Sequence, residues 1–549
     1  MTQLNLSTEK EFSGLDENSQ LAPTIQDFIK KGFFPKELVP AFTTESLAQN
    51  LDRVKQILES KQSPTTSKCF YYSFPKVKHL RRNLGIPNPS SQIKLSQILV
   101  NNWAEIEKTI SSCDLSISAP LTNSINRAVS PPPVQLSNER AIQAAGSRYR
   151  LYTDISRYYS TIYTHSIPWA IHGKSQCKDN LKLKRNQRHT LYGDLIDECV
   201  RNTQDKQSIG IPIGPDSSFV IAEIIGSIMD KMLCERLEYK PRGFRFIDDY
   251  YLYFDTFSEA EQALSQLHKI LKEFELETNP SKTSIVELPE PLESAWVSEI
   301  RRYSISSDLR EQNTEIISFF NQVFEYSKLF ADEQVIKYSL SRIRNESIPI
   351  SPKNWSLFES LILQSIIAEP SALETGTEIL YSYYEKGNYQ LDKSRIGDTI
   401  TALIVNASKL SHSHELAWAL WLSKTLQIPI KEEAARKISE IEDSVVAIVA
   451  LDLHEQGLIP KGLDLTRWKS LMTIDELYST NWLLAYEANI KGWLPSLGKS
   501  DHVNKDAFFG TLKANNVSFY DSTRQVNSVD DAQTEYDNDD ETEAYYWMY

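Results

Sequence analysis

The sequence is short of cysteine and has no long apolar run. Its five cysteines are scattered, and none forms a Cys-x-x-Cys pair or a Cys/His metal-binding spacing, which is typical of proteins in a reducing compartment. No stretch reaches the roughly 18 apolar residues of a membrane span. The N-terminal stretch MTQLNLSTEKEFSG has no apolar core, unlike a signal peptide. We therefore expect a cytoplasmic protein with no membrane partner.

Three common catalytic signatures are also missing. The sequence contains no P-loop, no His-Glu-x-x-His segment and no pattern typical of a Ser/His/Asp triad. Phosphate binding by a P-loop, zinc-dependent proteolysis and serine hydrolysis are therefore not indicated.

Basic residues are fewer than acidic ones, and the formal net charge is −14. Eight acids, however, lie between Asp530 and Glu543, where there is no Lys or Arg, and removing these eight leaves −6. Two basic clusters stand elsewhere in the chain. Their members are Lys76, Lys78, Arg81, Arg82 and Lys94 in the first, and Lys174, Lys178, Lys182, Lys184, Arg185 and Arg188 in the second. Each cluster is a candidate for contacts with a nucleic-acid phosphate backbone. The alternative is that its residues lie in a solvent-exposed loop.

Length and composition predict several domains in an α+β protein. At 549 residues the chain is too long for one hydrophobic core. From about residue 300 Gly and Pro become sparse, and amphipathic helical segments pair at intervals of roughly 35–45 residues, which predicts a HEAT-like all-α repeat domain. The expected divisions are a flexible N-terminus (1–23), an N-terminal region (24–147), a strand-containing region (148–300), the helical repeats (301–520) and an acidic, disordered tail (521–549).

Three acids stand beside apolar, strand-like stretches. Asp154 ends the stretch RLYTD, and Asp248 and Asp249 lie between FRF and YYLYF. The alternation on either side of the doublet predicts a tight β-hairpin with the acids at its tip. Ser258 and Glu261 then have the spacing of a capping box for a following helix.

Burying such acids is costly without a positive partner. Mg²⁺ is the natural partner, with Mn²⁺ as the alternative, because it is a hard cation that takes carboxylate oxygens together with substrate phosphates. Two such ions can activate a 3′-hydroxyl and stabilise a leaving pyrophosphate. The acids therefore indicate a nucleotidyl transferase.

The order of the motifs resembles that of a polymerase palm. Asp154 is followed five places on by an aromatic residue, then by a small-residue turn (SIGIPIGPDSSF) that opens a helix, then by the Phe-x-Asp-Asp hairpin. Over about residues 24–300 the chain resembles reverse transcriptases, and more narrowly the bacterial abortive-infection and defence-associated group. This resemblance implies a right-hand polymerase, with fingers in 24–147, a palm with motifs A–D in 148–300, and the helical repeats in place of the thumb.

The same resemblance implies roles for the acids and their neighbours. Asp154 and Asp248 would hold the catalytic ions, Asp249 would be a less direct carboxylate, and the backbone carbonyl of Ile155 would lie beside the metals. Lys282 matches a lysine that is a candidate general acid for pyrophosphate, although a solvated turn lysine is the alternative. For the Asp-Asp doublet the alternative is an ordinary turn with no catalytic role, because Asp is common in turns.

Nucleotide contacts are implied as well. Tyr159 corresponds to the aromatic gate that excludes a ribose 2′-hydroxyl by a clash, and its alternative is a core tyrosine. Gly214 and Pro215 belong to a turn that a nucleotide can approach closely. A glutamine is usual in reverse transcriptases where this chain has Ile213, which puts template-dependent checking of the nucleotide in doubt.

Basic residues complete the implied site. Lys76, Arg81 and Arg82 resemble the family's N-terminal basic strand, and Lys182, Lys184 and Arg185 are further candidates for nucleic-acid binding. Arg127, Arg140 and Arg148 are candidates for holding the incoming triphosphate by bidentate contacts. Of these three we favour Arg148 and Arg140.

The resemblance predicts an RNA-directed DNA polymerase that acts in antiphage defence. Its partners would be dNTPs, an RNA template such as a cognate non-coding RNA, the DNA product, and further copies of the chain bound through the helical domain. Two alternatives remain open. One is template-independent or protein-primed DNA synthesis, for which the C-terminal Tyr545, Tyr546 and Tyr549 are candidate primers. The other is a nucleic-acid-binding scaffold with a vestigial palm.

Overall fold

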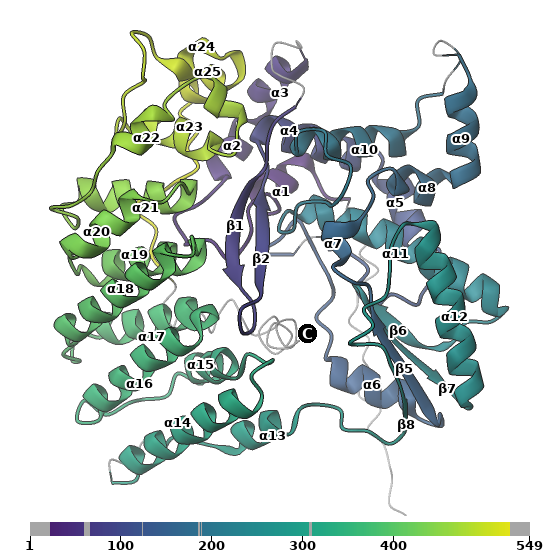
Figure 1. The fold of residues 1–549 in the computed structure, drawn as a ribbon, viewed down its shortest axis with the longest axis horizontal. Coiled ribbons are helices and arrows are strands. Elements are labelled where there is room, and N and C mark those ends of the chain that lie inside the picture. The colour runs from purple at the N-terminus through teal and green to yellow at the C-terminus, as the bar shows by residue number, and fades with distance from the viewer. Residues whose placement is uncertain are drawn as a thin grey trace, which may run out of the picture.

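The structure combines a small antiparallel sheet with a long array of helices (Figure 1). This computed structural model describes residues 22–59, 66–122, 124–184, 187, 189–306 and 310–526. The predicted mixture of strands and helices is confirmed at this level. The tail tyrosines Tyr545, Tyr546 and Tyr549, and also Arg185, lie outside the described residues.

The central sheet has the strand order β6-β7-β5-β8, and each neighbouring pair is antiparallel. Its strands are β5 (Tyr149–Asp154), β6 (Arg242–Phe246), β7 (Asp249–Phe254) and β8 (Ser284–Glu287). Two separate hairpins are formed by β1 (Phe70–Pro75) with β2 (Arg81–Ile86), and by β3 (Leu121–Thr122) with β4 (Val129–Ser130). The predicted hairpin around the Asp-Asp doublet is confirmed, since β6 pairs with β7.

Twelve helices are described before β8. They are α1 (Ile25–Lys30), α2 (Glu45–Gln49), α3 (Leu51–Glu59), α4 (Pro89–Asn101), α5 (Trp103–Ile110), α6 (Leu136–Ala144), α7 (Tyr158–Thr161), α8 (Ser166–His172), α9 (Lys174–Lys182), α10 (Tyr192–Thr203), α11 (Asp216–Leu237) and α12 (Phe257–Glu273). Helix α12 does begin with a capping box, but its residues are Thr256 and Glu259. The expected pair, Ser258 and Glu261, was wrong because the helix begins at Phe257, so its N-cap is two residues earlier than expected.

The two faces of the sheet pack against different helices. Because side chains alternate along a strand, Tyr250, Leu252 and Phe254 of β7 enter the core shared with α11 and α12. Tyr251 and Tyr253 point to the other face, where they pack with Leu136 of α6. Helix α11 is buried along most of its length, as expected of a helix whose apolar residues are not confined to one face.

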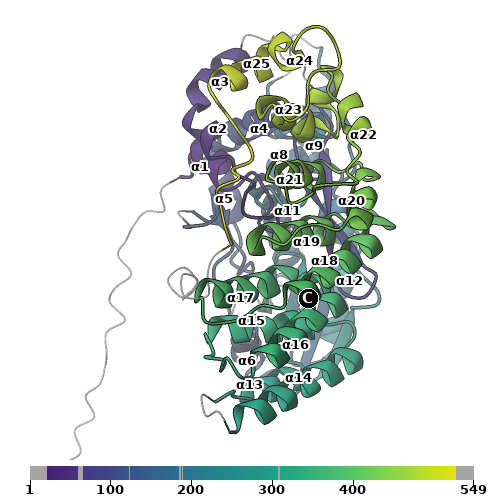
Figure 2. The same cartoon turned by 90° about the vertical axis from the view of Figure 1, so that its left-hand side faces the viewer.

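After β8 the described chain is helical. Its elements are α13 (Ala295–Arg302), α14 (Gln312–Leu329), α15 (Val335–Asn345), α16 (Trp355–Ala368), α17 (Leu373–Glu385), α18 (Lys393–Ser408), α19 (Ser413–Leu426), α20 (Glu432–Ser439), α21 (Ser444–Glu455), α22 (Thr466–Ser470), α23 (Trp482–Ile490), α24 (His502–Lys505) and α25 (Ala507–Ala514), with 3₁₀ turns at Pro370–Ala372 and Asp475–Tyr478. From α15 to α19 each helix contacts the second helix after it, and α14–α15, α16–α17, α18–α19 and α20–α21 are also in contact as neighbouring pairs. Figure 2 shows the array rising through the molecule in chain order.

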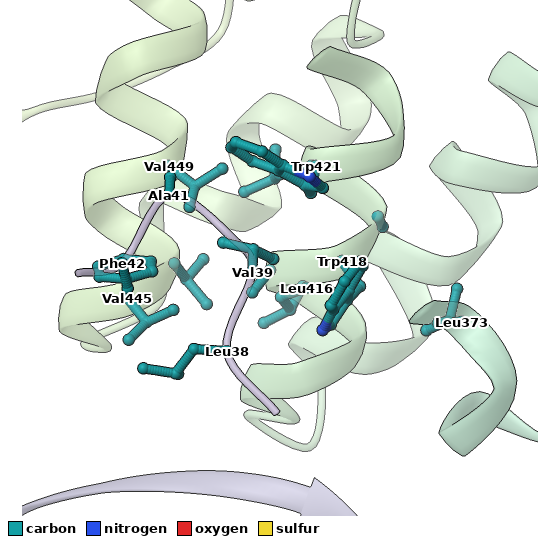
Figure 3. Close-up of a cluster of buried hydrophobic side chains, with 14 of the residues drawn as sticks. Leu38, Val39, Ala41, Phe42, Leu373, Leu416, Trp418, Trp421, Val445 and Val449 are labelled. Atoms are coloured by element: carbon teal, nitrogen blue, oxygen red, sulfur yellow. The ribbon is translucent and has the colours of Figure 1, made fainter. Parts of the chain in front are cut away.

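One hydrophobic core joins this array to the N-terminal part of the chain. Figure 3 shows the segment from Leu38 to Phe42 lying among side chains of α19 and α21, including Trp418 and Val445. The indole nitrogen of Trp418 donates a hydrogen bond to the carbonyl oxygen of Glu37, at 3.2 Å. The β1–β2 hairpin also contacts α19. The helical array therefore packs against both the segment from Leu38 to Phe42 and the β1–β2 hairpin.

None of the helices in the described ranges is long and apolar enough to cross a lipid bilayer.

Candidate active site

Strands β5 and β7 bring the three acids together. Asp154, the last residue of β5, lies directly opposite Asp249, the first residue of β7. Opposed residues of an antiparallel pair have Cβ atoms about 4.5–5.5 Å apart on one face of the sheet. Asp248 stands in the turn before β7, and its carbonyl oxygen accepts a hydrogen bond from the backbone nitrogen of Ile155, at 3.0 Å. The hairpin tip is thus tied to the end of β5.

The carboxylates are poorly compensated. Asp154 is buried, and its Oδ1 atom has no hydrogen-bond partner among the residues that the structure describes. Asp249 accepts one hydrogen bond from the hydroxyl of Tyr152, at 2.7 Å. Burial, together with the negative charge of Asp154, raises the pKa of Asp248. Burial and the charge of Asp248 raise the pKa of Asp249 to about 7. The site as a whole favours an added positive charge.

Lys282 supplies part of that charge. Its Nζ lies 2.9 Å from Asp154 Oδ2. The loop that carries it is fixed to β5, because the backbone nitrogen of Asn279 donates to the carbonyl oxygen of Asp154 at 2.9 Å. Burial alone lowers the pKa of Lys282, but its hydrogen bond to Asp154 and the attraction of the three acids outweigh that effect and raise it. Lys282 is therefore a protonated donor at the edge of the acidic group.

The arrangement fits a divalent ion that completes its shell with substrate. No group of three or more His, Cys, Asp or Glu side chains spaced to hold a metal ion is found in the described ranges. Mg²⁺, however, is commonly held by only one or two carboxylates plus substrate phosphates. The unpartnered Oδ1 of Asp154 leaves one carboxylate oxygen available to such an ion. A bound cation would also offset the burial and the repulsion from Asp154 that raise the pKa of Asp248. Ile155 follows Asp154 directly and its side chain is buried, while the role of its carbonyl stays a prediction.

Two of the predicted basic residues lie near the acids. Burial and the neighbouring charges of Arg82 and Lys282 lower the pKa of Lys76, while Asp248 and Asp249 oppose this effect, so these five side chains share one electrostatic environment. Arg82 also lines a cavity of about 850 Å³, to which Gly214 and Ile247 contribute.

Arg81, the neighbour of Arg82 on β2, points elsewhere. Its guanidinium forms a two-pronged ion pair with Glu415 of α19, at 2.5 and 2.8 Å. The two arginines therefore differ in what they contact: one faces the cavity, and the other joins the hairpin to the helical array. The second basic cluster is remote, since Figure 1 shows α9 at the outer edge of the molecule. There Lys182 pairs with Asp179, and Lys184 is exposed.

The structure does not bring Arg140 and Arg148 to the acids, which corrects our preference for them. Arg148 precedes β5, so the whole length of that strand, about 20 Å at 3.3 Å per residue, separates it from Asp154. It is exposed and lies 3.7 Å from Glu287. Arg140 is bound to Glu290 and to the carbonyl oxygens of Pro291 and Leu292. Both arginines have structural partners at the far end of the sheet.

Arg127, the third arginine candidate, lies at the turn before α11. It donates to Asp216 at 2.8 Å and to the carbonyl oxygens of Phe34 and Gly214, at 2.9 and 2.8 Å. Gly214 has a φ of +121°, and a Cβ there would lie 2.8 Å from the ring of Pro35. Glycine is therefore required at this position for a physical reason. Pro215 is the residue that precedes α11, and the turn lines the cavity through Gly214.

Tyr159 and Tyr158 have different surroundings. Tyr158 is buried, and its hydroxyl donates to the carbonyl oxygen of Ala222 at 2.8 Å. Tyr159 is half-buried on the first turn after Asp154. Burial raises its pKa, and the charges of Glu223 and Asp248 add to the effect. These contacts place Tyr158 in the core, while the role of Tyr159 as an aromatic gate stays a prediction.

A buried ionic network that sequence reasoning missed lies behind the hairpin tip. Arg245 of β6 pairs with Glu223 and Asp230 of α11, and all three side chains are fully buried. A signal was present in the sequence. Glu223 and Asp230 are seven residues apart, two helical turns, beside the apolar residues of α11, and Arg245 stands between two phenylalanines in β6. Charges inside apolar runs are expected to be paired.

Comparisons with known proteins give little further guidance. No protein-family model matches the sequence, and no curated protein matches it. Among solved structures, the chain is similar to apo telomerase from Candida tropicalis, with 12% sequence identity and a TM-score of 0.31 over 77% of this chain and 73% of that one. It is also similar to telomerase from Candida albicans in complex with a fragment of telomeric RNA, with 10% identity and a TM-score of 0.30 over 76% of this chain and 68% of the other.

Proposed function

We propose that this chain is an RNA-directed DNA polymerase that adds dNTPs by metal-assisted nucleotidyl transfer. The observation that carries the proposal is the opposition of Asp154 and Asp249 across two strands, with Asp248 tied to the same strand end and Lys282 2.9 Å from Asp154. Bound Mg²⁺, or Mn²⁺ in its place, would activate the primer 3′-hydroxyl and neutralise the departing pyrophosphate. Asp154 and Asp248 are its proposed ligands.

The other residues of the site have proposed tasks of their own. Lys282 delivers a proton to the leaving pyrophosphate, a general-acid step. The ring of Tyr159 occupies the space that a ribose 2′-hydroxyl would need, which favours deoxynucleotides. Lys76 and Arg82 attract phosphate groups to the acids and keep them there, since both belong to the same electrostatic environment.

The finer features of the proposal rest on the resemblance to defence-associated reverse transcriptases. They are a fingers and palm arrangement, a HEAT-like helical domain in place of the thumb, and a role in antiphage defence. Because function belongs to sites rather than to folds, the defence role needs its own test. Phage plating efficiency on a bacterial host that expresses the wild-type chain should fall, and Asp248→Asn should abolish that protection.

Activity can be tested directly. The nuclease-treated protein is incubated with Mg²⁺ and labelled dNTPs, with and without its co-purifying RNA. Asp248→Asn removes a proposed ligand, and Asp255→Asn, an exposed aspartate just beyond the other end of β7, is the matched control. Labelled DNA that depends on RNA, survives in Asp255→Asn and disappears in Asp248→Asn supports the proposal.

The same experiment separates the alternatives. Untemplated synthesis is an alternative because Ile213 stands where reverse transcriptases usually have a glutamine. The backbone of Ile213 is held by β2, since its carbonyl oxygen accepts a hydrogen bond from the backbone nitrogen of Gly85 at 2.6 Å. Label incorporated without RNA would replace templated synthesis with untemplated synthesis, and label that follows the protein into phenol would indicate protein priming. No incorporation by the folded protein in any arm would contradict the polymerase proposal and favour a scaffold.

A further inference from the structure

The turn that carries Asp248 has an unfavourable backbone. Ile247 has a φ of +55°, in the left-handed region where a β-branched residue is a genuine outlier. Such a conformation is strained and persists only where its surroundings fix it. The contacts of Ile247 therefore identify what determines the position of Asp248, its neighbour in the chain.

Both backbone polar groups of Ile247 are bound by side chains from behind the sheet. The carbonyl oxygen accepts a hydrogen bond from Arg245 Nη1 at 2.7 Å. The backbone nitrogen donates to Ser118 Oγ at 2.8 Å, and this hydroxyl in turn donates to Glu223 Oε1 at 3.0 Å. Glu223 also accepts from Arg245 Nη1 at 2.9 Å. The strained turn is thus held from both sides by one connected network.

Arg245 is itself fixed firmly. Its Nε lies 2.8 Å from Asp230 Oδ2, and Tyr250 donates to the other oxygen of Asp230 at 2.9 Å. Burial disfavours the charged guanidinium, but the attraction of Asp230 and Glu223 outweighs this and raises the pKa of Arg245 well above its usual range. A permanently charged, planar, multi-pronged donor is what arginine alone provides.

Helix α11 leaves space for that donor at one position. A Cβ on Gly226 would lie 2.6 Å from the Cζ atom of Arg245 and 2.8 Å from Nη1. Gly226 thus allows the guanidinium to lie against the helix backbone between Glu223 and Asp230. Even the smallest side chain at Gly226 would displace it.

We propose that Arg245 is a positioning residue of the acidic site, which acts through the Ile247–Asp248 turn to hold the Asp248 carboxylate within reach of the ion that Asp154 binds. It touches no reacting atom. Its effect passes from the guanidinium to the carbonyl of Ile247 and from there to Asp248, whose own carbonyl is bound to Ile155. This inference rests on the proposed function for its metal, but its test does not require polymerase activity.

The variants are chosen to shift the turn while Glu223 and Asp230 keep a positively charged partner. Removing Arg245 altogether would leave two buried carboxylates unpaired and threatens folding. Arg245→Lys keeps the charge and loses the fork, and Gly226→Ala displaces the guanidinium. Ser118→Ala removes the acceptor of Ile247 and one hydrogen bond to Glu223, and leaves the Arg245–Glu223 ion pair in place. Arg242→Lys is the matched control, because Arg242 is exposed on the same strand and donates only to Ala145 and Ser147 in the described contacts.

The main readout is binding of Mn²⁺, measured by electron paramagnetic resonance with no nucleotide present. Circular dichroism confirms that each variant is folded. We expect Arg245→Lys, Gly226→Ala and Ser118→Ala to bind Mn²⁺ at the acidic site about 10- to 100-fold more weakly, the usual effect of disturbing a residue that orients a metal ligand. Arg242→Lys should match the wild type, and Asp248→Asn defines complete loss.

The outcomes separate the two proposals. Folded variants that bind Mn²⁺ as the wild type does would overturn the positioning role, as would a wild-type protein whose Mn²⁺ binding is insensitive to Asp248→Asn. If the wild type binds Mn²⁺, the variants bind it weakly, and no protein incorporates dNTPs, the positioning role stands and the polymerase proposal fails. Where dNTPs are incorporated, the variants should also need more Mg²⁺ for half-maximal rate.

Discussion

Lys282 Nζ lies 2.9 Å from Asp154 Oδ2, so the loop before β8 places a cation against the last residue of β5. The contact leaves Asp154 Oδ1 buried and without a partner in the described structure. One oxygen of this carboxylate is therefore paired while the other remains available to an ion. Lys282 offsets part of the negative charge that burial makes costly.

A proton-donating role for Lys282 predicts different results for two substitutions. Lys282→Ala should lower the rate of dNTP incorporation by about 10²- to 10⁴-fold, the usual contribution of general acid catalysis. Lys282→Arg keeps the charge beside Asp154 but does not release a proton at neutral pH. Lys282→Arg should therefore be closer to the wild type than Lys282→Ala in thermal stability, while its rate of incorporation stays low. Single-turnover incorporation and thermal unfolding measure the two effects, and a Lys282→Arg variant with wild-type rate would show that only the charge matters.

The acidic group predicts a pH-dependent stability in the absence of metal. The pKa of Asp249 is about 7 in the folded protein, raised from 3.8 chiefly by burial and then by Asp248. Between these two values the folded state retains a proton that the unfolded state has released. The contribution of this group to the free energy of unfolding is therefore greatest below about pH 4 and is lost as the pH rises toward 7.

Urea unfolding in EDTA from pH 4 to pH 8 measures this effect as the difference between the wild type and Asp249→Asn. Relative to the variant, the wild type should lose stability steadily as the pH rises. Mg²⁺ should reduce the difference near neutral pH, because a bound cation favours the ionised carboxylate. Parallel stability curves for the two proteins would contradict the raised pKa.

The sequence predicted the parts of the site that depend on local pattern. The hairpin followed from apolar residues alternating on both sides of the Asp-Asp doublet, and β6 and β7 form it as expected. The exact opposition of Asp154 and Asp249 did not follow, because register depends on pairing between segments far apart in the sequence.

The residues that were wrongly assigned or overlooked are arginines whose direction along a strand, or whose burial, depends on the fold. Arg148 is only six residues from Asp154, but an extended strand carries it to the opposite end of the sheet. Arg81 and Arg82 are adjacent, and a strand sends adjacent side chains to opposite faces, so neither could be assigned without the fold. Arg245 was overlooked because its partners come from another element, and pairing across elements is invisible in a local pattern.

Tyr159 predicts the sugar selectivity of the site. Tyr159→Ala should increase the use of ribonucleotides relative to deoxynucleotides by about 10- to 100-fold, since a steric contact of this size discriminates by roughly 1–3 kcal/mol. Tyr158→Phe is the neighbouring control, because Tyr158 is buried and donates only to the backbone of Ala222 in the described contacts. It should leave selectivity unchanged. Competition between a labelled rNTP and dNTP gives the ratio, and unchanged selectivity in Tyr159→Ala would remove the gate assignment.

Arg81 and Arg82 predict a separation of folding from nucleic-acid binding. Arg82 lines the cavity to which Ile247, the neighbour of Asp248, contributes. Arg82→Ala should therefore weaken RNA binding and reduce the slope of log K against log salt by about one unit, as expected for one lost phosphate contact. Its thermal stability should stay near that of the wild type. Binding is measured by fluorescence anisotropy over a range of salt concentrations.

Arg81→Ala should give the opposite pattern. It removes the two-pronged partner of Glu415, whose side chain is only 5% exposed, and leaves that carboxylate with His412 at 3.1 Å. Loss of a donor to a buried carboxylate costs about 1–3 kcal/mol. The hairpin contact with α19 should therefore weaken, and the melting temperature should fall while the salt dependence of RNA binding stays unchanged. Equal losses of slope in the two variants would mean that Arg81 also reaches the nucleic acid, and the assignment of the two faces of β2 would be wrong.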